Sequence, residues 1–247
     1  QINGGWGKYR GGQHRRASEV VIENMRAMRK IVNTNAGRSL YHSSASRLHL
    51  EKGLRLSTSP DTHDVLSDAS TDHGFGFVNT RTGEYYFRPW STDEKRLNIF
   101  VMEAVGTFFM FRCNLHHLRK QSRVKLKLWG DNEGLARALK EVTSRGSRMV
   151  NALVRIMVID LSSLDVHMGC GTDVFDTAWC STDEMGPYGD ALSRNNEALF
   201  LSQFRKRHPQ THPKLLPHDH PTITQAEQEW QHVRTRFSAG RPSAAGR

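Results

Sequence analysis

The stretch Val65-Leu66-Ser67-Asp68-Ala69-Ser70, followed closely by Gly74-Phe75-Gly76-Phe77-Val78, decides the fold of this chain. The first segment is typical of a short apolar strand that carries one acid, and the glycines mark a turn into a second strand. An aspartate buried in such a strand is costly unless it has a partner. Asp68 therefore either caps a strand end or faces a cation, a hydrogen-bond donor or a metal.

Three more acids stand in similarly apolar surroundings further along the chain. Glu103 lies in Asn98-Ile99-Phe100-Val101-Met102-Glu103-Ala104, Asp131 in Leu128-Trp129-Gly130-Asp131-Asn132, and Asp190 in Gly189-Asp190-Ala191-Leu192-Ser193-Arg194. Asp131 follows a predicted strand, and ligand-binding groups of open α/β sheets collect at the carboxyl ends of strands. Four acids in such settings predict one shared site.

These four motifs, in this order, resemble the ribonuclease H domain of retroelement reverse transcriptases, of the long-terminal-repeat and tyrosine-recombinase kinds. The resemblance runs from about Thr62 to Arg194. One motif departs from the family pattern: the family usually has Asn-x-Ala-Asp where Met185-Gly186-Pro187-Tyr188-Gly189 precedes Asp190 here. The chain holds no Tyr-x-Asp-Asp motif of a polymerase palm, so this chain alone cannot polymerise.

The resemblance implies an α/β, RNase H-like fold with a five-stranded mixed sheet flanked by helices. Basic, extended arms are expected at both ends of the chain. The predicted divisions are a basic arm with an amphipathic helix (1–60), the RNase H-like domain (61–207) and a Pro/His-rich basic extension (208–247). Strands are predicted over 64–70, 74–79, 84–89, 124–129 and 175–180. Helices are predicted over 17–33, from 91 or 92 to 118, and over 133–142, 148–161, 188–205 and 224–237.

The resemblance also implies that Asp68, Glu103, Asp131 and Asp190 are catalytic residues that bind metal, with Asp68 bridging two ions. Mg²⁺, or Mn²⁺ in its place, prefers carboxylate oxygens. A pair of such ions supports in-line displacement at phosphorus. In the family the substrate is the RNA strand of an RNA–DNA hybrid, and Ser70 and Asn132 are predicted to contact it. A zinc site among the histidines between 208 and 220 is a weaker alternative, because no cysteines are spaced for it.

The net charge of +10 is concentrated in the flanks. Residues 1–30 carry +5 and residues 195–247 carry +4, whereas 31–194 carry only +1. Basic arms beside a neutral body indicate binding to a polyanion, although they also serve solubility. The predicted nucleic-acid contacts are Lys8, Arg10, Arg15, Arg16, Arg137, Lys140, Arg145, Arg148, Arg234, Arg236 and Arg241.

Two functions follow, and both are expectations. The first is an ordered RNA-binding subunit of a large ribonucleoprotein such as an organellar ribosome, in contact with RNA and other proteins, which places it in a mitochondrion. The alternative is an active Mg-dependent ribonuclease H that cleaves RNA–DNA hybrids, and a recombination role in the same fold is a third possibility. The odd count of three cysteines indicates free thiols and a reducing intracellular compartment. No apolar run is long enough to predict a membrane span.

Overall fold

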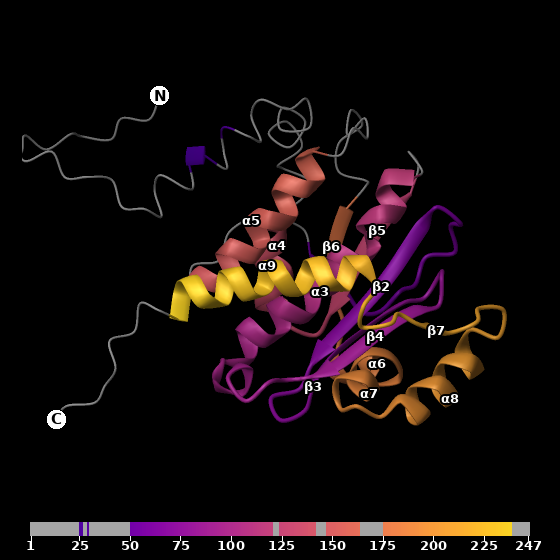
Figure 1. Cartoon of the computed structure of the whole chain (residues 1–247). Helices are drawn as coiled ribbons and strands as arrows, with labels where there is room; N and C mark the ends of the chain where they lie inside the picture. Colours follow the sequence, from indigo (N-terminus) through magenta and orange to yellow (C-terminus); the bar gives the residue numbers. More distant parts are fainter. Residues whose placement is uncertain are drawn as a thin grey trace, which may run out of the picture.

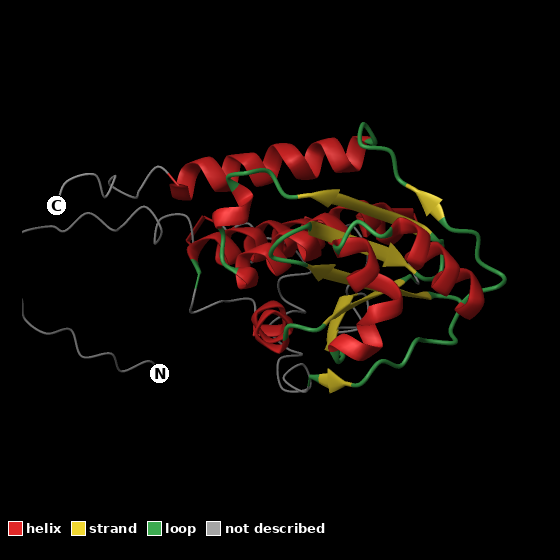
Figure 2. Ribbon diagram, turned by 90° about the horizontal axis from the view of Figure 1, so that it is seen from below, coloured by secondary structure: helices red, strands yellow, loops and turns green. Residues whose placement is uncertain are grey.

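The computed structural model describes residues 25, 26, 29, 50–120, 124–141, 147–163 and 175–238. Its centre is a seven-stranded mixed sheet in the order β1-β6-β5-β2-β3-β4-β7, with helices on both faces (Figures 1 and 2). The strands are β1 (Glu51–Lys52), β2 (Thr62–Ala69), β3 (Gly74–Asn79), β4 (Glu84–Pro89), β5 (Lys125–Gly130), β6 (Phe175–Trp179) and β7 (Lys214–Leu215). The mixed α/β class predicted from the sequence is confirmed.

Strands β2, β3 and β4 form the predicted antiparallel meander. Both β2 and β3 are buried along almost their whole length, so β2 buries polar side chains such as Asp64 and Asp68 beside its apolar ones. The β3–β4 turn depends on Gly83, whose φ of 75° lies in the left-handed region that favours glycine. A Cβ on Gly76 would lie 2.3 Å from the Cβ of Leu192, so this glycine allows a helix to pack directly on β3.

Strand β5 lies parallel to β2, and β6 lies parallel to β5. The β2–β5 pairing ends at Leu66 and Trp129, so the last residues of both strands are unpaired with each other. Because the strands are parallel, their carboxyl ends lie at the same edge of the sheet. Asp68 and Asp131 both lie just beyond the point where the pairing ends.

The sheet has seven strands instead of the predicted five. The five predicted strands correspond to β2–β6, and the two additional strands have two residues each. Strand β1 adds to the outer side of β6, and β7 adds to the outer side of β4. A two-residue strand shows no alternation in a sequence, so its position depends on the tertiary structure.

One face of the sheet is covered by α3 (Ile99–Lys120), α5 (Arg148–Ser163) and α9 (Pro221–Ser238). These helices contribute Phe108, Val154 and Trp230, respectively, to the larger hydrophobic core. Helix α4 (Glu133–Glu141) packs near β6. Helix α3 begins later than predicted. The Asn98 side chain accepts a hydrogen bond from the Val101 backbone N–H and caps it, and a short 3-10 turn, η1 (Glu94–Arg96), precedes it.

The helix predicted over 224–237 is confirmed as α9 (Pro221–Ser238), but the prediction that this part of the C-terminal extension is an extended arm is wrong. Helix α9 packs against α3 and α5 (Figure 1). Ile223, Ala226, Trp230 and Val233 are buried, at a spacing typical of one helix face. The segment before it, rich in proline and histidine, carries the two-residue strand β7 on the edge of the sheet.

The other face carries α6 (Thr182–Met185), the π-helical turn η3 (Gly186–Asp190), α7 (Ala191–Ser193) and α8 (Glu197–Arg207). They share the second core with Leu66 and Trp129. The sequence predicted one continuous helix over 188–205, but it breaks at Asn195, whose φ is 58°. Asparagine tolerates this left-handed conformation better than most residues, and Asn196 then caps α8 through the Leu199 backbone N–H.

A buried ion-pair cluster, named here the Arg88–Glu94 cluster, connects α9 to the sheet and consists of Arg88, Glu94, Glu227 and Trp230. The Arg88 guanidinium donates two hydrogen bonds of 2.9 Å to the Glu94 carboxylate. Trp230 Nε1 donates a third at 2.6 Å, and Glu227 pairs with Arg88 Nε at 2.6 Å. Burial opposes ionisation of Glu94, but the contacts with Arg88 outweigh it and lower the pKa of Glu94 to about 2.

No described helix combines the length and apolar character that a membrane-spanning helix requires. Most of the predicted helix over 17–33 lies outside the described residues, as do Lys8, Arg10, Arg15, Arg16, Arg145 and Arg241. Cys113 and Cys180 are buried free thiols, in agreement with the cysteine prediction for these two positions.

Candidate metal centre

Three of the four predicted acids meet at the carboxyl ends of β2 and β5. Asp68 extends from β2, Glu103 from the second turn of α3, and Asp131 from the residue directly after β5. One carboxylate oxygen of each lies within 4.8 Å of the others. Asp68 and Glu103 are buried, each 6% exposed, and Asp131 is half-buried. Residues 35 and 28 positions apart in the chain therefore form one cluster, named here the acid cluster.

Asp68 is held in place by a contact from the face of the sheet that carries α6, α7 and α8. Ser193 Oγ on α7 donates a hydrogen bond of 2.6 Å to Asp68 Oδ2. Burial, together with the nearby charges of Asp131 and Asp190, raises the pKa of Asp68 to about 6, although the Ser193 hydrogen bond opposes this shift. The carboxyl group therefore begins to take up a proton only slightly below neutral pH.

Glu103 comes from the face of the sheet that α3 covers. Burial raises its pKa well above the usual value, the charges of Asp68 and Asp131 add to this, and the Ala69 backbone N–H opposes it as a hydrogen-bond donor. A cavity of about 20 Å³, lined among others by Thr107 and Trp129, adjoins Glu103 and has room for one water molecule. The carboxyl group is thus close to both a second acid and a site that admits water.

Asp131 is the most exposed member of the cluster. Thr182 Oγ1, at the start of α6, donates a hydrogen bond of 2.9 Å to Asp131 Oδ2. The backbone carbonyl of Asp131 accepts a hydrogen bond of 2.8 Å from Trp179 Nε1 at the end of β6. These contacts fix the loop after β5 and leave the carboxylate directed to the region between β2 and α6.

Asp190 lies next to the cluster but outside the group of oxygens that fall within 4.8 Å of one another. Its carboxylate accepts a hydrogen bond of 2.8 Å from Arg194 Nε, one helical turn later. Its charge is nevertheless close enough to raise the pKa of Asp68. The structure thus brings together Asp68, Glu103 and Asp131 and places Asp190 at their margin, paired with an arginine.

Two residues that position the cluster had no role in the sequence prediction. A Cβ on Gly189 would lie 2.7 Å from the Cβ of Asp68, so only glycine allows η3 to approach β2 this closely. Ser193 bridges the two elements, because its hydroxyl also contacts the Asp190 carbonyl at 3.0 Å. The signal for both was present in the motif Gly189-Asp190-Ala191-Leu192-Ser193-Arg194, where a glycine directly precedes an acid.

The two predicted substrate contacts have structural partners. Asn132 Oδ1 accepts a hydrogen bond of 3.0 Å from the Leu135 backbone N–H and caps α4. Ser70 lies in the β2–β3 turn, where its hydroxyl contacts His73 Nδ1 at 3.3 Å and its carbonyl accepts a hydrogen bond from Trp90 Nε1. Ser70 is two residues after Asp68, and Asn132 directly follows Asp131, so each lies close in sequence to an acid of the cluster.

The basic residues predicted to contact nucleic acid differ in their exposure to solvent and in whether an acidic side chain is paired with them. Arg137, on α4, is exposed and pairs with Glu133 at 2.7 Å, and Arg148 is exposed at the start of α5. Lys140 is largely buried and pairs with Asp176 at 2.9 Å, so its charge is already balanced. Arg234 donates hydrogen bonds to Ser91 and Gln231. Arg236 lies over the ring of Phe237, and both Arg234 and Arg236 belong to α9.

The acid cluster fits a hard divalent cation. Among the described residues, none of the ion pairs involves Asp68, Glu103 or Asp131, although two of these side chains are buried. Neighbouring carboxylates raise one another's pKa, and a cation between them removes this penalty. Three carboxylates within a few ångströms supply the oxygen ligands that Mg²⁺ prefers.

A comparison with known protein families finds no matching family model. A search of curated proteins finds no similar sequence.

Proposed function

We propose that the chain is a metal-dependent nuclease of the ribonuclease H type, which cleaves the RNA strand of an RNA–DNA hybrid. The observation that carries the proposal is the convergence of Asp68, Glu103 and Asp131 within 4.8 Å, without a cationic side chain paired to any of them in the described part of the chain. The five longer strands, three antiparallel and two parallel to the first, support the RNase H-like fold that the sequence resemblance implies.

The residues that would hold Mg²⁺ or Mn²⁺ are Asp68, Glu103 and Asp131. When bound, such ions lower the pKa of a coordinated water and stabilise the charge that develops during displacement at phosphorus. Asp68 is the central ligand, because it lies between β5 and η3 and interacts electrostatically with Glu103, Asp131 and Asp190. Ser193 fixes its orientation by donating a hydrogen bond to Oδ2.

Asp190 takes a different role in this proposal. Its pairing with Arg194 is exposed on the arginine side, so the pair can open when a substrate phosphate approaches Arg194. An exposed i,i+4 ion pair contributes only about 0.3–0.5 kcal/mol, and such an opening is therefore inexpensive. Asp190 would then join the cluster only when substrate is bound, which agrees with its position at the margin.

Hybrid selection is proposed to involve the residues that border the cluster. Ser70 directly follows β2, Asn132 is the second residue after β5, and Arg137 is exposed on α4, the helix that follows. A minor groove that displays 2′-hydroxyl groups is recognised by hydroxyl and amide side chains, whereas phosphates are bound by arginine. The prediction of Ser70 and Asn132 as RNA contacts depends on the sheet edge at the acid cluster facing the substrate.

The test is cleavage of an RNA–DNA hybrid labelled on the RNA strand, in Mg²⁺ or Mn²⁺. The wild-type chain should cleave, and Asp131→Asn should lose at least about a hundredfold in rate, because the change removes a charge that the cation requires. Asp183→Asn is the matched control, since Asp183 is exposed on α6 and has no part in the cluster. Cleavage that survives excess chelator, or that Asp131→Asn leaves unchanged, would contradict the proposal.

The second candidate function is an RNA-binding subunit of a large ribonucleoprotein, placed in a mitochondrion. The observation that favours it is the charge of the flanks, +5 over residues 1–30 and +4 over residues 195–247. Part of the C-terminal charge belongs to α8 and α9, which are packed on the domain and are not an extended arm. Stoichiometric RNA binding without hybrid cleavage would favour this second function.

A further inference from the structure

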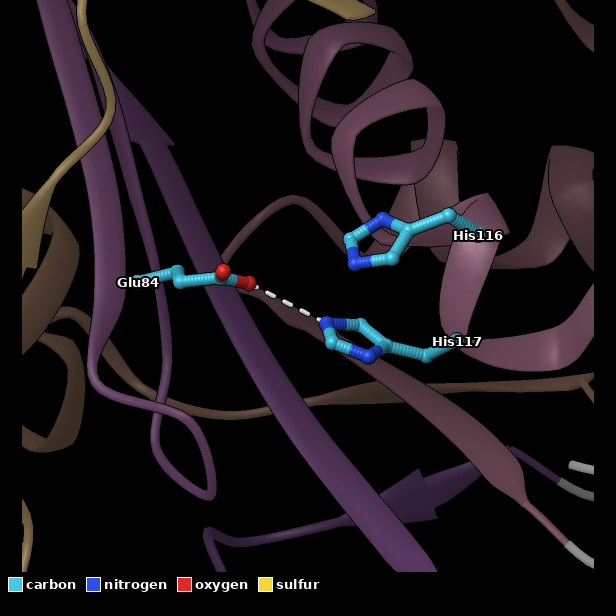
Figure 3. A group of neighbouring side chains, drawn as sticks. All are labelled: Glu84, His116 and His117. Carbon is cyan, nitrogen blue, oxygen red and sulfur yellow. Dashed lines mark hydrogen bonds and ion pairs between the residues drawn. The ribbon is translucent and has the colours of Figure 1, made fainter. Parts of the chain in front are cut away.

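A second group of metal-ligating side chains lies at the opposite end of α3 from the acid cluster. Glu84 is the first residue of β4, and His116 and His117 lie near the end of α3 (Figure 3). Thirteen residues of helix separate Glu103 from His116, which places the two groups about 20 Å apart. We propose that Glu84, His116 and His117 form a binding site for a first-row transition metal ion such as Zn²⁺.

The distances suit a tetrahedral ion. The ligand atoms of Glu84, His116 and His117 lie within 4.8 Å of one another. His117 Nε2 is 3.1 Å from Glu84 Oε2, close to the roughly 3.3 Å that separates two ligands of a tetrahedral zinc with bonds of about 2.05 Å. Both imidazoles turn a ring nitrogen toward the Glu84 carboxylate (Figure 3). Small side-chain rotations would therefore complete three protein ligands and leave a fourth position for water.

The His116 ring is in the tautomeric state that a metal requires, whereas His117 Nε2 donates to Glu84 and would give up this proton to a bound ion. His116 Nδ1 lies 2.8 Å from the Cys113 backbone carbonyl. A carbonyl only accepts, so Nδ1 carries the proton and the lone pair of the neutral ring is on Nε2. A histidine ligand usually donates its second ring N–H to such a carbonyl, which fixes the ring and raises its basicity.

A buried hydrogen-bond chain keeps the neighbouring His63 neutral. The Asn79 side-chain oxygen accepts hydrogen bonds from the backbone N–H groups of Arg81 and Thr82, so its amide nitrogen faces His63 Nδ1 at 3.1 Å and donates to it. The same nitrogen donates to Asn114 Oδ1 at 2.6 Å. His63 therefore carries its proton on Nε2 and adds no second charge beside the site.

The charges around the site also favour a cation. The His63 ring lies 4.7 Å from that of His117, and because Asn79 donates to its Nδ1 it adds no positive charge there. The negative end of the α3 dipole lies at the same place. Arg81 on the β3–β4 turn is the opposing positive charge, and it is exposed to solvent.

Such an ion would connect the end of α3 to the start of β4, on the sheet edge that β7 extends. Glu84 lies opposite Lys214 in the parallel pairing of β4 with β7. A bound metal would therefore link α3 to two paired strands, β4 and β7, that are distant from it in sequence. The inference is independent of the nuclease proposal, because it uses different residues at the other end of the helix. The donor set also differs: two imidazoles and one carboxylate select a transition metal, whereas three carboxylates select Mg²⁺ or Mn²⁺.

The test is titration of the full-length chain with Zn²⁺ against a chromophoric chelator, followed by visible absorption with Co²⁺. The wild type should bind one Zn²⁺ through this site, and Co²⁺ should give the intense bands of a four- or five-coordinate ion. His117→Ala and Glu84→Gln should each weaken this binding by more than about tenfold, since the loss of an outer-sphere partner alone costs 10–100-fold. Glu84→Gln keeps the side-chain shape, so its effect cannot be ascribed to unfolding.

Two control variants distinguish this site from other side chains of the protein that could bind Zn²⁺. His212→Gln removes an exposed histidine of the Pro/His-rich segment and should leave Zn²⁺ affinity unchanged. Asp131→Asn changes the acid cluster and should also leave it unchanged. Equal Zn²⁺ affinity in the wild type, His117→Ala and Glu84→Gln would overturn the inference, and so would the absence of Zn²⁺ binding by the wild type.

Discussion

Two groups of buried acids in this chain have opposite electrostatic environments. In the Arg88–Glu94 cluster, the Glu94 side chain is 1% exposed and faces a guanidinium that donates two hydrogen bonds to it. In the acid cluster, Asp68 and Glu103 are nearly as buried but face other carboxylates. The pKa of Glu94 is lowered to about 2, whereas the pKa values of Asp68 and Glu103 are raised.

The difference indicates what each group is for. A buried carboxylate with a complete set of partners holds elements together, and here it connects β4, η1 and α9. Buried carboxylates that lack a cation store unfavourable free energy, which a bound ion can release. Strongly raised pKa values beside a sheet edge are typical of functional sites. The contrast between the two clusters leads to the following predictions.

The largest expected effect is a loss of unfolding free energy when the Arg88–Glu94 cluster is disrupted. Arg88→Met leaves the Glu94 carboxylate buried without its counterion, and breaking a buried pair in this way costs roughly 3–5 kcal/mol of unfolding free energy. Urea denaturation of the purified chain measures it. Lys52→Met is the control, because it removes an exposed ion pair with Glu133 and should cost less than about 1 kcal/mol. Equal losses for the two variants would contradict the conclusion that the Arg88–Glu94 cluster stabilises the fold through a buried ion pair.

The next effect is a pH dependence that belongs to Asp68. Its pKa is raised to about 6 in the folded chain by burial first and by Asp131 and Asp190 second, so the folded state binds a proton before the unfolded state does. The folded state therefore gains stability from this group as the pH falls through about 6, and the gain is complete below the unfolded pKa of 3.8.

The measurement is the unfolding free energy of the wild type minus that of Asp68→Asn, followed from pH 7 to pH 4 without metal. This difference should increase by about 2–3 kcal/mol over that range. His63, whose pKa is lowered to about 4, destabilises both proteins as the pH falls from 6.5 toward 4, and it cancels in the difference. A difference that stays flat or decreases would show that Asp68 is ionised in the folded state throughout.

The smallest expected effect separates Glu103 from Glu94. Glu103→Gln removes a charge that burial and two other acids disfavour, so without metal it should raise the unfolding free energy at pH 7, by about 1 kcal/mol. Glu94→Gln should lower it, because it weakens the pairing with Arg88. Thermal unfolding of both variants beside the wild type is sufficient. Destabilisation by Glu103→Gln in metal-free buffer would contradict the account of the acid cluster.

The sequence allowed the acid cluster to be predicted better than its surroundings. Asp68, Glu103 and Asp131 each interrupt an apolar stretch, and such an interruption is visible without a structure. Asp190 stands in a motif of the same kind, but its pairing with Arg194 depends on the π-helical turn η3, which no local pattern announces. The departure of Met185–Gly189 from the family motif coincides with this turn.

The fold was predictable where the periodicity was long and failed where it was short. The five longer strands and helices α3, α4 and α5 follow apolar patterns of several residues. Strands β1 and β7 have two residues each and depend on the neighbouring strands for their existence. The packing of α9 was missed for another reason. Its composition is polar, and only the buried row that includes Ala226 and Trp230 commits it to the core.

The His116–His117 pair shows a third limit of prediction from the sequence alone. Two adjacent histidines are visible in the sequence, but Glu84 lies 32 residues before the first of them, on strand β4. The contact exists because the β3–β4 turn places Glu84 beside the end of α3. No spacing rule for metal ligands within one segment would have predicted it.

The central claim is that Asp68, Glu103 and Asp131 hold divalent cations. A crystal structure of the chain soaked in Mn²⁺, with an anomalous difference map recorded near the manganese edge, tests it most directly. The account predicts an anomalous peak within about 2.2 Å of carboxylate oxygens from Asp68 and Asp131, and none at this place in crystals of Asp68→Asn. A wild-type map with no peak among these three carboxylates, under Mn²⁺ concentrations that saturate any activity, would contradict it.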